Sequence, residues 1–549
     1  MKMSEQKCLT LFDVTGIQEF VFGPNKAKEN IGGSIYVQQI FEQGLKECIG
    51  ENNSTLDWEN HQELQIVADD SIRAEIVYIG GGNAMVVFNS KTTAVEITKK
   101  LSKKLLDDTQ ATLGVVVAHL ETDLDNFQHD RKELFDLLRK KKKQFVNSIP
   151  LRGISITEEC ADGLPTPNSK KTDKNFVSKT TAHKIKLAEK DSQFDDLLPE
   201  GYLFPKEFDD LGQQEGESHI AVVHIDGNSM GRFIDKQLEN ITDYSVAIPN
   251  IRDISKKIRN LYRRVFKEMV KNTTEALNEN VQKRIKLKYD KKSGLPFLPL
   301  RPIILNGDDV TFVCDGRIGI QLANHFLKLL LEKELELDSG NEALSACAGI
   351  AIVKSHFPFY RAYELAEELC GSAKKKAKTL NKENPGSWMD YHIVYSGFQL
   401  DLDAMRKEQY NVPGMDAVSR NVEYPQYNLL LRPFCVAGKA DKYYQWKKMF
   451  YLYRDLAVDY KEKKPKTFPR SRLKNLRNGF ITSKEEVRQI VIENASRNYN
   501  LPAFEIGRGL ENLPNSEGEI FTEKQTPYFE PLELLDFYIP ELKLEQEDR

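Results

Sequence analysis

The chain has 549 residues, with 78 Lys or Arg against 82 Asp or Glu, and its formal net charge at pH 7 is −4. Hydrophobic residues make up 40% and charged residues 29% of the sequence, which excludes a disordered or fibrous protein. This length exceeds one compact core, and we expect three or four domains. No uncharged apolar run approaches the roughly 18 residues of a membrane span. Residues 1–7 lack a signal-peptide profile, so we expect a cytoplasmic protein without a membrane partner.

Cysteine and histidine residues give little indication of a metal centre. The seven cysteines are dispersed and no two have the CxxC spacing of a zinc site, so we expect reduced, mostly buried thiols. His129 and Asp130 form the only His-Asp dipeptide, which a metal-dependent phosphohydrolase could use if further His and Asp ligands lay nearby. A polar helix face explains this dipeptide more simply.

The first 120 residues have the pattern of one α+β unit. Short apolar runs rich in β-branched residues predict strands, and longer amphipathic stretches predict helices. The predicted strands cover residues 8–14, 72–78, 85–88 and 113–119, and the predicted helices begin at 17 and cover 34–47 and 92–107. The glycine-rich turn Gly80-Gly-Gly-Asn83 joins the second and third strands as a hairpin. This β-α-β-β-α-β order predicts a ferredoxin-like fold, the fold of nucleotidyltransferase palms.

Residues 121–216 have a weaker pattern, and we assign them to a linker and helical segment. Residues 162–173 are rich in Pro, Ser, Thr and Lys, as expected of an exposed loop. Residues 139–143 form a basic run that could contact nucleic acid, although a solvated helix face is the simpler explanation.

The same order of elements repeats over residues 217–395. Strands are predicted over 219–225, 301–305, 310–314 and 344–353, and helices over 232–238 and 320–334, with a Lys- and Arg-rich helical insertion over 251–288. The chain is therefore predicted to hold two tandem ferredoxin-like palm domains of the cyclase-like kind, one degenerate and one with a catalytic motif.

Residues 396–549 are predicted to form a helical C-terminal domain. Within it, residues 461–477 hold eight basic residues against one acidic residue. Such a segment could contact a phosphate backbone, and a basic face for a protein partner explains it nearly as well.

Three carboxylates of the second palm are predicted to converge. Asp226 ends its first strand, and Asp308 and Asp309 lie at the turn of its hairpin. The first and third strands of a ferredoxin-like sheet are neighbours, so these side chains should meet. Carboxylate oxygens on rigid strands suit Mg²⁺ or Mn²⁺. Two such ions about 3.5 to 4 Å apart can activate a 3′-hydroxyl and stabilise a pyrophosphate leaving group.

The turn residues agree with this hypothesis. Gly307 allows a tight turn, and Gly227 leaves room for a triphosphate beside the first strand. An Asn-Gly-Asp-Asp sequence alone would predict only a hairpin, because all these residues favour turns. Converging like charges would repel without a cation, and this favours a metal site.

The first palm provides an internal control. Its hairpin turn carries no carboxylate, although Asp13 persists on its first strand. One acidic ligand should not hold two metal ions. We expect the first palm to be a structural partner with a residual nucleotide pocket at its face toward the second palm.

Several motifs resemble one family. Asp13-Val-Thr-Gly-Ile-Gln-Glu-Phe20 followed by Gly32-Gly-Ser34 is similar to the first palm of the large subunit of type III CRISPR effectors, the Cas-ten/Cmr-two family. Asp226-Gly-Asn-Ser-Met-Gly231 resembles that family's Asp-Gly-Asp-Asn-Met-Gly, and Asn306-Gly-Asp-Asp309 resembles its Gly-Gly-Asp-Asp. Further similar segments are Ser345-Ala-Cys-Ala-Gly-Ile350, Ala373-Lys-Lys-Lys-Ala-Lys378 and Leu431-Arg-Pro-Phe434. The resemblance extends from about residue 8 to residue 480.

The resemblance implies a function and a set of site residues. The family's second palm makes cyclic oligoadenylates from ATP, which activate antiviral effector proteins. The implied partners are an NTP, guide and target RNA, and other effector subunits. The implied catalytic and metal-binding residues are Asp226, Asp308 and Asp309, and the implied nucleotide-binding residues are Gly227, Asn228, Ser229, Gly307, Lys354 and Lys374.

The sequence departs from the family pattern in three respects. The first palm begins within ten residues of Met1, so we expect a form without the N-terminal HD nuclease domain. No cysteine pairs stand between the palms, where the family often carries zinc. Asn306 replaces the first glycine of the hairpin motif, and because asparagine tolerates a positive φ the turn can survive. Asn228 replaces an acidic residue, which leaves the number of metal ions open.

The sequence thus predicts a metal-dependent nucleotidyltransferase that makes cyclic oligonucleotides, with oligoadenylate from ATP as the expected product. The alternative is a non-catalytic scaffold subunit that binds RNA through residues 251–288 and 461–477. A template-dependent polymerase is disfavoured, because no separate fingers-sized or thumb-sized module is apparent.

Overall fold

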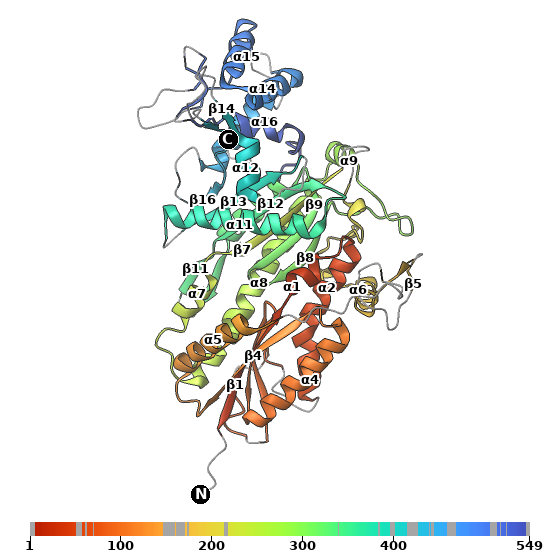
Figure 1. Ribbon diagram of the computed structural model, residues 1–549, viewed down its shortest axis with the longest axis vertical. Coiled ribbons are helices and arrows are strands. Elements are labelled where there is room, and N and C mark those ends of the chain that lie inside the picture. Colours follow the sequence, from red (N-terminus) through yellow and green to blue (C-terminus); the bar gives the residue numbers. More distant parts are fainter. Residues whose placement is uncertain are drawn as a thin grey trace.

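The computed structural model contains two β-sheets, each covered by helices, followed by a mainly helical C-terminal region (Figure 1). In Figure 1 the first sheet lies at the bottom, the second in the middle and the C-terminal helices at the top. The structure describes residues 6–50, 57–60, 63–69, 71–146, 160, 171–172, 175–212, 218–338, 340–382, 385–395, 401–413, 426–438, 440, 444–457, 468–504, 513–515, 518–522 and 524–544.

The first sheet has four antiparallel strands in the order β2-β3-β1-β4. This is the strand order of a ferredoxin-like unit and confirms the prediction. The strands are β1 (Lys7–Thr15), β2 (Ala74–Gly80), β3 (Asn83–Phe88) and β4 (Gly114–Thr122). The helices are α1 (Ile17–Phe22), α2 (Ala27–Gln39), a π-helix (Ile40–Leu45), α3 (Lys46–Ile49), α4 (Lys91–Thr109) and α5 (Phe127–Gln144).

Helix α2 begins earlier than the pattern predicted, because its two glycines lie inside the helix. Gly32 faces α6 (Lys179–Glu189) at such close range that a Cβ there would overlap the backbone of Lys184. The glycines that weaken the sequence signal for a helix therefore permit tight helix packing.

The second sheet has six strands in the order β16-β13-β12-β7-β9-β8. The four predicted strands again form a ferredoxin-like unit, and two further strands, which the pattern did not predict, extend its edge. The strands are β7 (His219–Gly227), β8 (Leu300–Asn306), β9 (Asp309–Asp315), β12 (Ala346–Lys354), β13 (Ser387–Ile393) and β16 (Phe434–Ala437). The helices are α7 (Met230–Gln237), α8 (Tyr244–Ala276), α9 (Glu279–Ile285), α10 (Gly319–Glu332) and α11 (Phe359–Leu380).

The duplication includes one helix beyond the predicted β-α-β-β-α-β order. In both units a helix begins five residues after the fourth strand ends, at Phe127 after Thr122 and at Phe359 after Lys354. Helix α5 packs on β4 and β1, just as α11 packs on β12 and β7. The first unit therefore continues to Gln144, beyond the boundary predicted at residue 120.

The C-terminal region is mainly helical, as predicted, with one short strand pair. Its elements are α12 (Leu402–Tyr410), β14 (Asn411–Pro413), β15 (Gln426–Asn428), α13 (Trp446–Ala457), α14 (Arg470–Thr482), α15 (Lys484–Ser496) and α16 (Phe529–Glu533). The buried guanidinium of Arg432 joins this region to the second sheet. It lies 2.6 Å from Glu533 and 4.1 Å from the ring centre of Tyr391 on β13.

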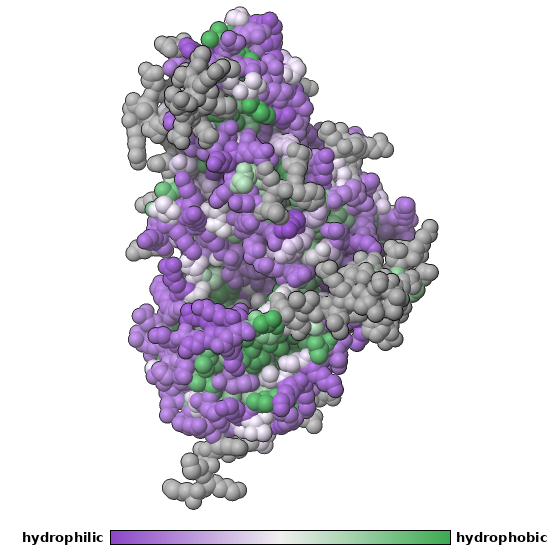
Figure 2. Space-filling view, viewed as in Figure 1, coloured by the Kyte–Doolittle hydropathy of each residue, from purple (hydrophilic) through white to green (hydrophobic). Residues whose placement is uncertain are grey.

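Most of the face seen in Figure 2 is polar, apart from apolar side chains gathered over the first palm. Apolar residues are otherwise concentrated in cores between sheets and helices. Among the helices in the described ranges, none combines the length and apolar character needed to cross a bilayer.

Candidate active site

Two strand ends of the second palm bring the predicted carboxylates together. Strands β7 and β9 are antiparallel neighbours, and Asp226 lies directly opposite Asp309. Asp308 precedes Asp309 in the hairpin turn, where Gly307 has a φ of 62°. A residue with a side chain adopts this left-handed conformation only at a cost, so the turn explains the glycine.

Gly227 makes room for an aspartate. A Cβ at this position would lie 2.7 Å from Oδ2 and 2.9 Å from Cβ of Asp308. The Asp308 side chain thus lies against Gly227 on the side where a Cβ would point, and the room for a triphosphate stays a prediction. Ser229 follows with a φ of 56° at the start of α7, and places the helix beside the site.

The Asn228 side chain is used within the fold. Its Nδ2 donates to Oγ of Ser345 at 3.0 Å and to the carbonyl oxygen of Gly386 at 2.8 Å. These bonds join the end of β7 to the start of β12 and β13. The structure therefore gives the Asn228 Nδ2 group a structural role, and the nucleotide contact of Asn228 stays a prediction.

The two predicted lysines lie in different places. The Lys374 ammonium group forms an ion pair with Asp226 and donates to the carbonyl oxygen of Gly227 at 3.0 Å. Lys354 ends β12 and pairs in register with His219, at the opposite end of β7 from Asp226. At about 3.3 Å per residue, it lies more than 20 Å from the carboxylates, so the predicted phosphate contact of Lys354 does not fit this fold.

The site carries more negative than positive charge. Burial, followed by the charges of Asp226, Asp308 and Glu367, raises the pKa of Asp309 to about 8, against the opposing effect of Lys374. Burial and the charge of Asp226 likewise raise the pKa of Asp308. These carboxylates resist ionisation together unless a cation offsets their repulsion.

The neighbouring histidine does not supply that charge. Burial lowers the pKa of His224 to about 4, so the ring is neutral near pH 7. Its Nδ1 lies 3.1 Å from Oγ1 of Thr311 and 3.6 Å from Oδ1 of Asp309.

The carboxylate oxygens fit a divalent cation whose remaining ligands come from water and substrate. Oδ1 of Asp309 is buried without a hydrogen-bond partner. Within the described ranges, no three His, Cys, Asp or Glu side chains are close enough to enclose a metal ion unaided. Mg²⁺ commonly binds one or two carboxylates and takes its other ligands from water and substrate phosphates. Asp226, Asp308 and Asp309 are the residues that would hold it.

A cavity of about 210 Å³ lies between the two palms beside Asp309. Its walls come from α1, α2 and the Gly81–Gly82 turn of the first palm, and from Asn306, Asp309 and Tyr363 of the second. The palms are held together there by Phe22, whose ring stacks on Tyr363 at 3.7 Å. This cavity lies at the face where the sequence predicts a nucleotide pocket.

The first palm repeats the lysine–aspartate pair without the hairpin carboxylate. Asp13 lies opposite Asn83 in register, as Asp226 lies opposite Asp309. Nζ of Lys142 on α5 lies 2.7 Å from Oδ1 of Asp13. Lys142 is 15 residues after Phe127, the same interval as from Phe359 to Lys374. The basic run 139–143 therefore contributes one ion pair to this palm.

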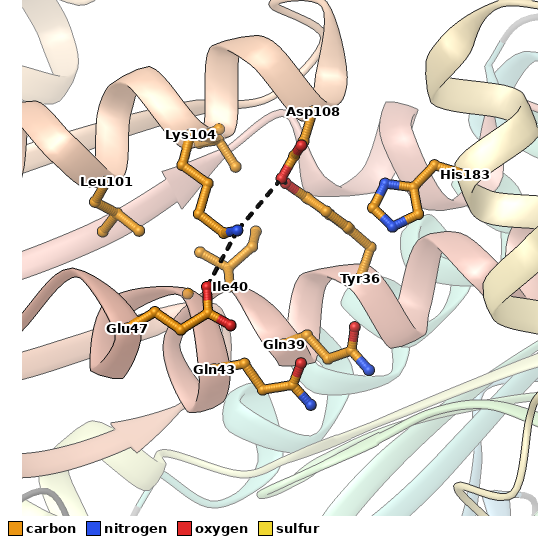
Figure 3. A pocket seen from close by; sticks show the side chains of 11 residues that line it. Tyr36, Gln39, Ile40, Gln43, Glu47, Leu101, Lys104, Asp108 and His183 are labelled. Carbon is orange, nitrogen blue, oxygen red and sulfur yellow. Dashed lines mark hydrogen bonds and ion pairs between the residues drawn. The ribbon is translucent and has the colours of Figure 1, made fainter. Parts of the chain in front are cut away.

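A second cavity, of about 150 Å³, lies within the first palm between α2, the π-helix and α4 (Figure 3). Lys104 reaches across it, 3.2 Å from Glu47 and 4.0 Å from Asp108. None of the residues that the family resemblance implies lines this cavity. It is separate from the candidate active site.

Sequence reasoning missed two residues beside the site. Nε2 of Gln18 on α1 donates to Oε1 of Glu367 on α11 at 2.7 Å. These residues are 349 positions apart, so no local spacing could pair them. Gln18 lies within a motif that resembles the family's first palm, which is the one available signal.

The strand order and the opposed strand-end carboxylates are those of a palm domain of nucleotidyltransferases and cyclases. Residues 219–383 match the family model described as Cas10/Cmr2, second palm domain. This match confirms the family resemblance over the second palm. No curated protein matches the sequence.

Solved structures have a similar fold. A Csm1-Csm4 cassette in complex with cA3 has a TM-score of 0.50 at 11% identity, with 97% of this chain and 70% of that chain covered. Csm1 from T. onnurineus has a TM-score of 0.49 at 11% identity, with 96% and 70% covered. A cassette in complex with cA4 has a TM-score of 0.41 at 12% identity, with 68% and 53% covered. The chain thus spans about half the length of the last of these relatives.

Proposed function

We propose that the second palm is a metal-dependent nucleotidyltransferase that makes cyclic oligonucleotides as an antiviral signal. The expected product is cyclic oligoadenylate made from ATP. The observation that carries this proposal is the opposition of Asp226 and Asp309, with Asp308 against Gly227 beside them, in a segment that matches the Cas10/Cmr2 second palm. The similar cassette described in complex with cA3 supports this product class.

The proposed reaction is attack of a 3′-hydroxyl on the α-phosphate of an NTP, with formation of a phosphodiester bond and release of pyrophosphate. A bound divalent cation would offset the charge that develops on the phosphate oxygens. Asp226, Asp308 and Asp309 would hold that cation. The Lys374 ammonium group pairs with Asp226 and would place a positive charge near the phosphates of a bound NTP. Positioning and electrostatics would supply most of the rate enhancement.

The cavity between the palms is the proposed nucleotide site. Asn306 and Asp309 of the second palm line it together with the Gly81–Gly82 turn of the first palm, so an NTP bound there would lie beside the carboxylates. The first palm keeps Asp13 and Lys142 but has Asn83 where the second palm has Asp309. We therefore assign nucleotide binding, without catalysis, to the first palm.

Incubation of the protein with each NTP and Mg²⁺ or Mn²⁺, alone and with total cellular RNA, tests the proposal. Mass spectrometry should detect a cyclic product, and its mass identifies the base. Absence of any product from every mixture, together with co-purifying RNA, would favour the scaffold function.

One observation favours RNA contact as a second function. Lys257, Arg263, Arg264 and Lys267 line an open groove of about 490 Å³ on α8. Arg263 is paired with Asp196, and Lys257 lies 2.6 Å from Asp253, whereas Arg264 and Lys267 are exposed. By contrast, Arg470, Lys474 and Arg477 on α14 surround Asp536 at 2.6 to 3.3 Å. The described part of the segment 461–477 thus already has an internal counter-charge.

The groove on α8 makes a measurable prediction. Removal of two phosphate contacts by Arg264→Ala with Lys267→Ala should reduce the slope of log K against log salt for single-stranded RNA by about 1.4. Fluorescence anisotropy of labelled RNA measures this slope, with Lys291→Ala and Lys292→Ala as the matched control. An unchanged slope would remove α8 from the RNA-binding surface.

A further inference from the structure

Glu367 on α11 is an acidic group that no motif of the sequence identifies. It lies four residues after Tyr363 and seven before Lys374, which places all three on one face of the helix. Tyr363 lines the cavity together with Asp309, and Lys374 pairs with Asp226. Glu367 therefore faces the carboxylate cluster from the helix that covers it.

The first palm fixes the orientation of Glu367. Gln18 donates to its Oε1 at 2.7 Å, and Gln18 itself lines the cavity between the palms. Helix α1 is held against α11 by the stacking of Phe22 on Tyr363, at 3.7 Å with an interplanar angle of 16°. A glutamate side chain at this position would otherwise sample several rotamers.

The charge balance indicates what this group faces. Glu367 is half-buried and has no cationic partner among the residues that the structure describes. With Asp226, Asp308 and Asp309 it makes four acidic groups beside one lysine. Glu367 is also close enough to Asp309 for their charges to interact. A further carboxylate without a counter-ion would be unfavourable here unless a cation occupies the site.

We propose that Glu367 is an outer acidic residue of the cation site: it accepts hydrogen bonds from water bound to the cation, and Gln18 holds it in position. This inference rests on the proposed function. Mg²⁺ loses its water reluctantly and keeps several water ligands in protein sites. Groups that bind a metal through its ligands typically change metal affinity by about 10- to 100-fold when they are removed. Glu367 is thus a positioning residue, and it gives the first palm a part in the site of the second.

A charge-removing variant separates this role from simple contact between the palms. Glu367→Gln keeps the length of the side chain and a carbonyl oxygen that can accept from Gln18, but it removes the charge. Glu364→Gln is the matched control, because Glu364 lies one turn earlier and pairs with Arg361 at 2.6 Å. Mn²⁺ affinity of the full chain is measured by isothermal titration calorimetry in the presence of a non-hydrolysable ATP analogue, and folding by thermal melting.

Glu367→Gln should weaken Mn²⁺ binding by 10-fold or more without a change in melting temperature, and Glu364→Gln should bind as the wild type does. Gln18→Leu should weaken binding less, because the charge remains while its orientation is lost. Wild-type Mn²⁺ affinity in Glu367→Gln would overturn this inference and leave the proposed function standing. Absence of Mn²⁺ binding by the wild type would instead overturn both.

Discussion

Replacement of Gly227 by alanine should disturb catalysis far more than folding. The added Cβ would lie 2.7 Å from Oδ2 and 2.9 Å from Cβ of Asp308, and 3.0 Å from Cγ of Met230. Ordinary contacts of this kind exceed 3.4 Å, so Asp308 must move by roughly 0.5 to 1 Å. A misplacement of about 1 Å at a reacting centre can cost about 100-fold in rate. Overpacking of this size typically costs about 1 to 3 kcal/mol of stability, which a palm of this size should survive.

The assay is formation of cyclic product from ATP, with thermal melting of the same samples. Gly231→Ala is the control, because Gly231 lies in α7 and has no neighbouring atom within 4 Å of an added Cβ. Gly227→Ala should lose about 100-fold in rate, and Gly231→Ala should retain wild-type activity. Wild-type turnover by folded Gly227→Ala would refute the placement of Asp308 in the reacting site.

Two further predictions concern stability. Gly349→Ala should destabilise the protein by about 1 to 3 kcal/mol, because the added Cβ would overlap the backbone of α11 at Ala366. Gly371→Ala, on the open side of that helix, should leave the stability unchanged. Thermal melting compares the two variants, and equal melting temperatures would contradict the packing of α11 on β12. His224 favours its neutral form in the fold, so its contribution to stability is complete above its ordinary pKa of 6.5 and is lost as pH falls through about 4. That contribution is at most about 3 kcal/mol. Glutamine does not titrate, so the melting temperature of His224→Gln should fall less between pH 7 and pH 4 than that of the wild type. An identical fall in both proteins would assign acid unfolding to other groups.

The four strands that form the ferredoxin-like unit of each palm were predictable because they are short apolar segments with turn residues between them. Asp226 and Asp309 are 83 residues apart, yet the fixed order of a ferredoxin-like sheet makes their strands neighbours. The convergence of these carboxylates therefore follows from the order of the elements. The hairpin glycine at 307 agrees with this, because its conformation is a property of the local turn.

Features that depend on how helices pack were less predictable. The sequence identified Lys374 but not its pairing with Asp226, because that pairing depends on the close approach of α11 to β12 at Gly349. It also identified Lys354, for which local similarity gave no indication that β12 carries it to the far end of the sheet. The contact of Gln18 with Glu367 joins two domains and leaves no periodic signal in either segment.

Pyrophosphate release from ATP by Asp308→Asn and Asp309→Asn variants tests the central claim most directly. These variants keep the size of both side chains and remove the charges that would hold a cation. Wild-type protein with Mg²⁺ or Mn²⁺ should release pyrophosphate and form a cyclic product. Each variant should melt at the wild-type temperature or above it, but its rate of pyrophosphate release should fall by at least about 100-fold. Turnover by both variants at the wild-type rate would contradict a nucleotidyltransferase site at these strand ends.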